Sequence, residues 1–72
     1  MQIMEQIVKA INSSTYRKIK GIRQSELAKE IGVSCVTMSS WEQGKSLPNA
    51  DQLYRLAIAL GVSMEDLCVW EK

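Results

Sequence analysis

The sequence predicts an all-α fold, and three observations lead to this prediction. Its 72 residues, 46% hydrophobic and 24% charged, have the composition of one small globular domain rather than of a disordered chain. Runs of β-branched residues with a period of two are absent, so we expect no strand. Four glycines follow segments with helical periodicity, where glycine commonly ends a helix: Gly21, Gly32, Gly44 and Gly61. The prediction is a single compact domain of about five short helices over residues 1–72.

The first expected helix, residues 2–20, rests on periodicity. Seven residues fall within an arc of about 160° on a helical wheel: Ile3, Met4, Ile7, Val8, Ile11, Thr15 and Ile19. The segment Asn12-Ser13-Ser14-Thr15, however, suits the start of a helix better than its interior. We expect a continuous or kinked helix, with a break near Ser13 as the alternative.

Helix-end chemistry sets the bounds of the remaining expected helices: 24–31, 35–43, 50–60 and 64–70. Ser34 can cap the second of these through its hydroxyl, and Ser63 can cap the last, with Asp66 three residues on as its partner. The segments before the two serines share one pattern, Leu27-Ala28-x-x-Ile31-Gly32-Val33-Ser34 and Leu56-Ala57-x-x-Leu60-Gly61-Val62-Ser63. We interpret this as one kind of helix end used twice rather than as a tandem repeat.

The composition argues against an enzyme. The chain has no histidine, the most common general base and a common metal ligand, and no nucleophile-elbow, Walker or zinc-protease motif. Its two cysteines make neither a disulfide framework nor a metal site and fit a reduced, cytoplasmic setting. No apolar run could span a membrane, and a secretory signal is not expected. We therefore expect no catalysis, no metal, no cofactor and no small-molecule ligand.

The helix expected at 35–43 has an unusual outward face. Met38 and Trp41 fall on the side that would be buried, whereas an opposite arc of about 140° holds five uncharged residues: Cys35, Val36, Ser39, Ser40 and Gln43. Outward helix faces usually carry Lys, Glu and Arg. Small hydrogen-bonding side chains suit close approach to another surface, either DNA base edges or a protein partner. A chance run of weakly polar residues is the alternative explanation.

Glu42 falls near the buried arc of the same helix. Because an unpaired carboxylate is costly to remove from water, Glu42 needs a cationic partner. Arg17 or Lys18 at the end of the first helix is the natural candidate. We expect a Glu42–Arg17 pair that joins the two helices, with an exposed Glu42 as the alternative.

Several motifs, taken in order, resemble the Cro/lambda-repressor-like helix-turn-helix family, often called XRE. They are Gln24-Ser25-Glu26-Leu27-Ala28, Gly32-Val33-Ser34, Trp41-Glu42-Gln43-Gly44-Lys45, Pro48 and the Leu56–Ser63 segment. The resemblance covers about residues 17–67. It implies a five-helix lambda-repressor-like domain with its helix-turn-helix at about 24–43, and a transcriptional regulator, a repressor, associated with the nucleoid.

The resemblance also implies which residues meet double-stranded DNA. In the family, the N-terminal part of the second helix of the motif reads the major groove, which turns four residues toward the bases: Cys35, Val36, Ser39 and Ser40. Five residues would meet phosphate: Gln24, Arg23, Gln43, Lys45 and Ser46. Arg17 and Glu42 match positions where family members often keep a buried ion pair.

The sequence departs from the family pattern at three places. The reading helix has no Arg or Lys, so the bidentate contact of Arg to guanine is not available from it. Ser13 replaces a usual aliphatic residue in the first helix. Arg23 stands where a capping Ser, Thr or Asn is common, so we expect helix 24–31 to begin less well capped.

Residues 64–72 leave two interpretations open. Leu67, Val69 and Trp70 belong to an apolar run that either folds back onto the core or contacts a second copy. We expect a homodimer, at least on DNA. Because the net charge is only +1, a protein-interaction module on the same scaffold, antitoxin- or adaptor-like, is the alternative function.

Overall fold

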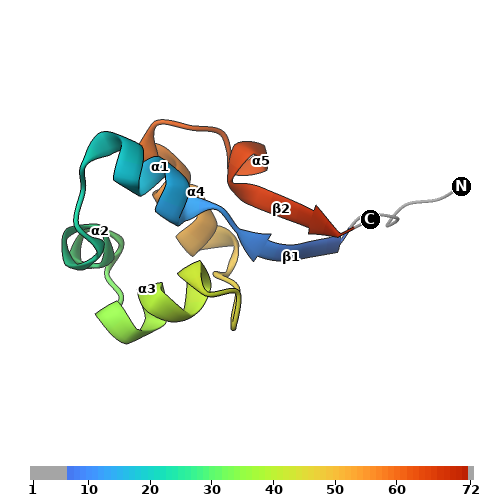
Figure 1. Cartoon of the computed structure of the whole chain (residues 1–72), viewed down its shortest axis with the longest axis horizontal. Helices are drawn as coiled ribbons and strands as arrows, with labels where there is room; N and C mark the ends of the chain where they lie inside the picture. Colours follow the sequence, from blue (N-terminus) through green and yellow to red (C-terminus); the bar gives the residue numbers. More distant parts are fainter. Residues whose placement is uncertain (1–6, 72) are drawn as a thin grey trace, which may run out of the picture.

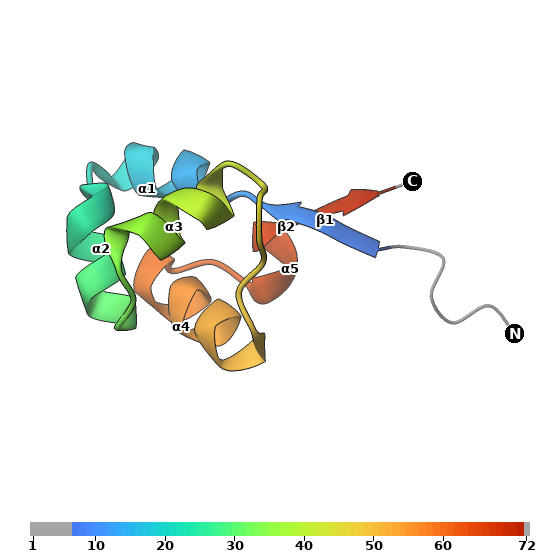
Figure 2. The same ribbon diagram turned by 90° about the horizontal axis from the view of Figure 1, so that it is seen from below.

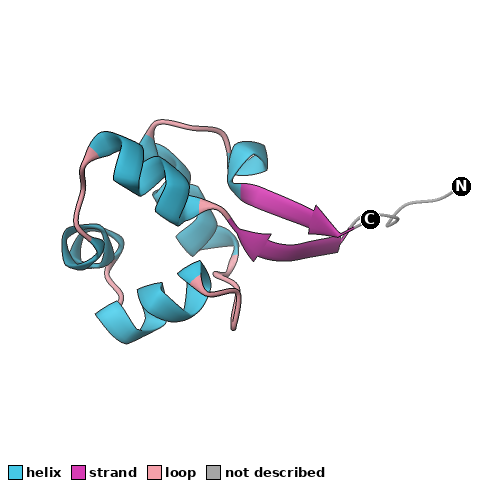
Figure 3. Cartoon of the chain, in the orientation of Figure 1, coloured by secondary structure: helices cyan, strands magenta, loops and turns pink. Residues whose placement is uncertain are grey.

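The computed structural model describes residues 7–71, in which five helices surround one core and two strands form an antiparallel ribbon (Figures 1 and 3). The elements are β1 (Ile7–Ile11), α1 (Ser13–Lys20), α2 (Gln24–Ile31), α3 (Cys35–Glu42), α4 (Ala50–Leu60), α5 (Met64–Leu67) and β2 (Cys68–Glu71). The helices pack together at one end of the molecule, and the β1–β2 ribbon projects from them (Figure 2). The expected five-helix, mostly α architecture is confirmed, and the small sheet was not anticipated.

The expected helix over residues 2–20 is wrong in its first half. The segment Ile7–Ile11 forms strand β1, and the helix begins at Ser13, where the capping residues had offered the alternative. Three of the five residues of β1 are β-branched and suit a strand, but its pairing partner lies at the other end of the chain. The local pattern of apolar residues contains no information about a pairing partner so far away in the sequence. Residues 2–6 of the expected helix lie outside the described part of the chain.

The expected helix over 64–70 is also shorter than predicted. It ends at Leu67, and the chain turns into the extended strand β2 at Cys68. The strands pair in the register Ile7↔Glu71, Val8↔Trp70, Ala10↔Val69 and Ile11↔Cys68, with an irregularity between Val8 and Ala10. The backbone N–H of Asn12 donates to the Leu67 carbonyl at 2.7 Å and continues this pairing to the start of α1. The expectation of no strand was therefore wrong.

The capping expectations hold for α3 and α5. The Ser34 hydroxyl accepts a hydrogen bond from the backbone N–H of Thr37 at 3.1 Å. The Ser63 hydroxyl accepts from the N–H of Asp66 at 3.0 Å, and the Asp66 carboxylate accepts from the N–H of Ser63 in return. Both caps satisfy backbone donors that a helix start would otherwise leave unpaired, so the two serines fix where these helices begin.

One hydrophobic core joins β1 to helices α2 to α5. Its buried residues are Ile11, Leu27, Ala28, Ile31, Met38, Trp41, Leu56, Ala57, Leu60 and Leu67. Because Leu67 has no exposed surface, it packs within its own chain and is not free to contact a second copy, which corrects the expectation for that residue. None of the helices in residues 7–71 is long and apolar enough to cross a bilayer.

Ser13, the first residue of α1, is fully buried. Its hydroxyl makes no hydrogen bond within the described structure. A buried polar group without a partner loses its hydration and gains nothing in return. This position is thus a local weakness of the fold.

Replacing Ser13 with alanine should stabilise the domain. Removing the unpaired hydroxyl is expected to raise the free energy of unfolding by about 1 kcal/mol, measured by urea denaturation followed by circular dichroism. Ser13→Thr is the matched control: it keeps the hydroxyl and should bring no gain. A loss of stability in Ser13→Ala would show that the hydroxyl has a partner in solution.

Candidate nucleic-acid interface

Helix α3 is attached to the domain along one side. Met38 has no exposed surface and Trp41 is 2% exposed, and both pack into the core. The turn from α2 passes through Gly32, whose φ of 88° lies in the left-handed region that favours glycine. The two helices therefore form a helix-turn-helix in which the opposite side of α3 faces outward.

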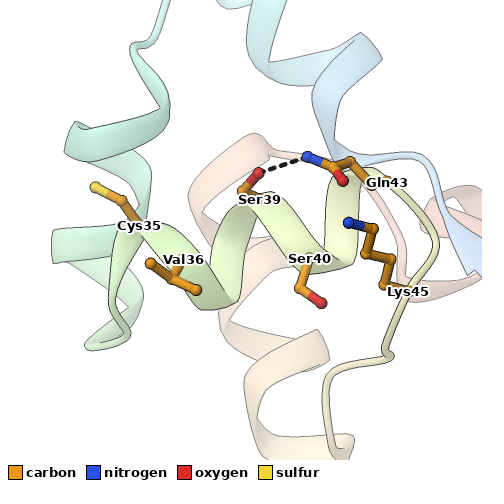
Figure 4. Close-up of a pocket in the computed structure, with 6 residues that line it drawn as sticks. All are labelled: Cys35, Val36, Ser39, Ser40, Gln43 and Lys45. Carbon is orange, nitrogen blue, oxygen red and sulfur yellow. Dashed lines mark hydrogen bonds between the residues drawn. The ribbon is translucent and has the colours of Figure 1, made fainter.

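The outward side of α3 carries the four residues expected to face the bases. Val36 is 79% exposed, Cys35 is exposed, and Ser39 and Ser40 are half-buried. They line an open hollow together with Gln43 and Lys45, which follow at the end of the helix (Figure 4). All six side chains thus share one surface, and Lys45 provides its only formal charge.

Hydrogen bonds between side chains order this surface. The Gln43 amide Nε2 donates to the Ser39 Oγ at 2.8 Å, as Figure 4 shows. The Ser46 hydroxyl donates to the Ser40 Oγ at 3.0 Å, and the backbone N–H of Lys45 donates to the Ser40 carbonyl at 2.9 Å. Sequence reasoning did not foresee the Ser46–Ser40 contact, because the loop after α3 has no helical spacing from which to derive it.

Arg17 and Glu42, the expected ion pair, lie in contact between α1 and α3. Arg17 Nε donates to Glu42 Oε2 at 2.8 Å, and Arg17 Nη2 donates to Oε1 at 3.1 Å. The side chains are only 12% and 9% exposed. Arg17 Nη1 also donates to the Ile22 carbonyl at 2.9 Å. This bidentate geometry compensates both charges where little water reaches them.

Gln24, expected at the phosphate backbone, takes part in the same network. Its amide Nε2 donates to Glu42 Oε1 at 3.1 Å, and the residue is half-buried at the first position of α2. Arg23 precedes it, is exposed and offers no side-chain cap to the helix. Instead, the backbone N–H of Arg23 donates to the Glu26 carboxylate at 2.8 Å. The cationic side chain of Arg23 therefore takes no part in capping α2 and remains available for other contacts.

The two cysteines differ in their surroundings. Cys35 is exposed at the start of α3, and Cys68 is half-buried at the start of β2. Burial, followed by the nearby Glu65 carboxylate, raises the pKa of the Cys68 thiol, which donates weakly to the Met64 carbonyl at 3.3 Å. No group of three His, Cys, Asp or Glu residues within residues 7–71 could hold a metal ion.

Comparison with known families gives this geometry a name. The family model described as "Helix-turn-helix" matches residues 14–67, which include all five helices except the first residue of α1. The chain belongs to this XRE-type helix-turn-helix family, to which Cro- and lambda-repressor-like proteins belong. The resemblance inferred from the sequence motifs is confirmed.

Individual relatives are similar over most of this chain. The uncharacterized helix-turn-helix regulator MJ0272 of Methanocaldococcus jannaschii is 36% identical over 56 residues, which are 78% of this chain and 85% of the relative. The transcriptional repressor RstR of a cryptic phage CTXphi in Vibrio cholerae is 36% identical over 52 residues, 72% of this chain and 46% of the relative. The chain therefore spans about half the length of RstR.

A solved structure shows the same fold on DNA. The P22 c2 repressor, crystallised in complex with a synthetic operator, is 40% identical, with a TM-score of 0.71. The matched region covers 74% of this chain and 80% of that one. The arrangement of helices described above is thus one that a related protein has in a complex with operator DNA.

Breaking the buried Arg17–Glu42 ion pair should lower the free energy of unfolding far more than breaking the exposed Asp51–Arg55 ion pair. Glu42→Ala leaves the Arg17 charge buried without compensation and is expected to lower the free energy of unfolding by about 3 kcal/mol. The control is Asp51→Ala, which removes the exposed pair with Arg55 on α4 and should cost no more than about 0.5 kcal/mol. Equal losses in urea denaturation would contradict a structural role for the buried pair.

Proposed function

We propose that this chain is a DNA-binding transcriptional regulator, a repressor that acts by occupying promoter DNA. The observation that carries the proposal is the outward side of α3, where small uncharged side chains, exposed or half-buried, line one open hollow on a helix-turn-helix. In this fold the second helix of the motif enters the major groove. Relatives named as repressors, one of them crystallised with an operator, support the same assignment.

In this proposal, Val36, Ser39 and Ser40 read base edges from α3. The two serine hydroxyls can donate to or accept from several bases, and the valine methyls can pack against a thymine methyl. Cys35 lies one residue before Val36 at the rim of the same surface. Because Ser39 and Ser40 already have side-chain partners in Gln43 and Ser46, DNA meets hydroxyls that are held in place.

Phosphate contacts come from both sides of that surface. Lys45 and Arg23 are exposed cations, and Gln43, exposed after α3, keeps a second amide N–H for phosphate. Ser46 is also exposed there, but its one hydroxyl proton must leave Ser40 before it can donate to phosphate. Gln24 acts indirectly. Its hydrogen bond to Glu42 positions the start of α2 against α3. The N-termini of α2 and α3 add backbone N–H groups that favour phosphate.

Specificity per copy is modest in this proposal. Because α3 carries no Arg or Lys, each mismatched base pair is expected to cost nearer ~1 than ~3 kcal/mol. Additional discrimination would come from DNA shape and from a homodimer that binds an inverted repeat, with recognition helices about 34 Å apart. Val69 and Trp70 on β2 are the candidate contacts for that dimer.

A protein-interaction module, antitoxin- or adaptor-like, is the second candidate function. The neutral surface of α3 and the net charge of +1 favour it, since most nucleic-acid-binding domains carry a larger positive charge. Salt dependence separates the two candidates, because displacement of counterions from phosphate is a property of nucleic acid binding.

Titration of a random-sequence 20-bp duplex pool at two salt concentrations tests the proposed function. Affinity should fall by roughly 0.9 log unit per log unit of salt for each phosphate neutralised. Ser39→Glu should weaken binding at least tenfold at low salt, because it places a carboxylate next to the DNA. Ile58→Glu, which adds the same charge on the exposed side of α4, is the control. Affinity that does not change with salt would overturn the proposal, and a normal Ser39→Glu variant would exclude α3 as the reading helix.

The natural cysteines provide a footprint of the same surface. Cys35 should react with iodoacetamide faster than Cys68, because it is exposed whereas Cys68 is partly buried with a raised thiol pKa. Saturating DNA should slow the reaction of Cys35, as measured by mass spectrometry of tryptic peptides. Unchanged labelling of Cys35 in the complex would place the DNA elsewhere.

A further inference from the structure

The hydrogen bond between Ser39 and Gln43 limits what the Ser39 hydroxyl can offer to a ligand. A serine hydroxyl has one proton to donate and two lone pairs that accept. Gln43 Nε2 donates to Ser39 Oγ at 2.8 Å, so this bond uses a lone pair and leaves the Ser39 proton free. An oxygen that already accepts one hydrogen bond is also a stronger donor in the next one. Ser39 therefore presents a donor on the outward side of α3.

Lys45 favours the orientation of the Gln43 amide on which this polarity depends. An amide that turned over would bring Gln43 Oε1 to Ser39 and would reverse the hydrogen bond. Lys45 lines the same hollow and provides its only formal charge, and Figure 4 shows the Gln43 oxygen on the side of the Lys45 ammonium group. Because a cation attracts a carbonyl oxygen and repels an N–H group, Lys45 keeps the amide nitrogen directed to Ser39.

Ser40, the next residue of α3, has a partner that does not fix its polarity. Its Oγ accepts from Ser46 Oγ at 3.0 Å, but both groups are hydroxyls, and each can donate or accept. Rotation of the two hydroxyls reverses this bond without moving a heavy atom. The amide nitrogen of Gln43 cannot accept, because it has only N–H groups to offer. The two neighbouring serines therefore differ: Ser39 is a fixed donor, and Ser40 can act either way.

We propose that Ser39 is a specificity-determining residue that selects guanine or thymine, and that Gln43 is the positioning residue that imposes this choice. The inference rests on the proposed function, in which α3 reads base edges. In the major groove guanine offers the acceptors O6 and N7 and thymine offers the acceptor O4, whereas cytosine offers only the donor N4–H. A cytosine next to Ser39 would bring its N–H toward a hydroxyl proton and an amide N–H. Ser39 thus rejects cytosine, and Ser40 discriminates less.

Selection from a random-sequence duplex pool, followed by anisotropy titration of single-base variants of the selected site, tests the role of Ser39. Ser39→Ala identifies the base position that Ser39 reads, because selectivity should fall there. At that position the wild type should bind guanine or thymine about fivefold more tightly than cytosine. The position that loses selectivity in Ser40→Ala is the control within the same helix and should show a smaller ratio. A wild type that favours cytosine at the Ser39 position would overturn the inference.

Gln43→Glu tests the positioning role, because it keeps the shape of the side chain and reverses the hydrogen bond. A carboxylate only accepts, so Ser39 donates to it and turns its lone pairs to the base. The preference at the Ser39 position should then shift toward cytosine, while the added negative charge weakens binding to every sequence alike. The ratio of affinities, rather than either affinity, is therefore the readout.

The double variant Ser39→Ala/Gln43→Glu is the matched control. A shift toward cytosine that persists without the Ser39 hydroxyl would show that the introduced carboxylate reads the base itself, and it would overturn the positioning role of Gln43. A preference that disappears in the double variant supports that role.

The outcomes separate this inference from the proposed function. A chain that binds no duplex at low salt would refute the proposed function and this inference with it. Duplex binding that tolerates cytosine at the Ser39 position, or a base preference that Gln43→Glu leaves unchanged, would refute this inference alone and leave the proposed function standing.

Discussion

The buried contact among Arg17, Glu42 and Gln24 is the interaction on which the arrangement of the reading surface depends. It joins the end of α1, the start of α2 and the end of α3 through three side chains, of which Arg17 and Glu42 have little access to water. A carboxylate in such a place is tolerable only with charge-assisted partners, so its presence fixes all three helices relative to one another. The contacts of Glu42 on the inward side of α3 therefore set the direction in which its outward side faces.

Helix α3 itself is short, and its stability comes from its attachments. Met38 and Trp41 hold one side in the core, and the Ser34 hydroxyl satisfies the first turn. Eight residues would be a marginal helix in isolation. The exposed side can therefore hold serine, cysteine and valine, which are weak helix formers, because packing rather than propensity maintains the helix. The residues on the exposed side of α3 are therefore not constrained by helix propensity and can suit contact with another molecule.

The β1–β2 ribbon adds a second contribution to the domain. It joins the two ends of the described chain and extends the pairing up to α1 through the contact of Asn12 with Leu67. The ribbon projects from the helical body (Figure 2), and its strand β1 contacts α3.

The sequence by itself determined the helix-turn-helix, because its signals are local: Ser34 and Ser63 as caps, glycines at helix ends, and Met38 with Trp41 on one side of α3. It also predicted the partners Arg17 and Glu42, since a carboxylate near a buried arc requires a cation. Tertiary structure alone decided the ends of the chain. The segment Ile7–Ile11 has an apolar pattern that suits a helix or a strand equally, and its pairing with Cys68–Glu71, far away in the sequence, selects the strand. The hydrogen bonds of a helix are local, whereas those of a sheet depend on a partner that no window of the sequence contains.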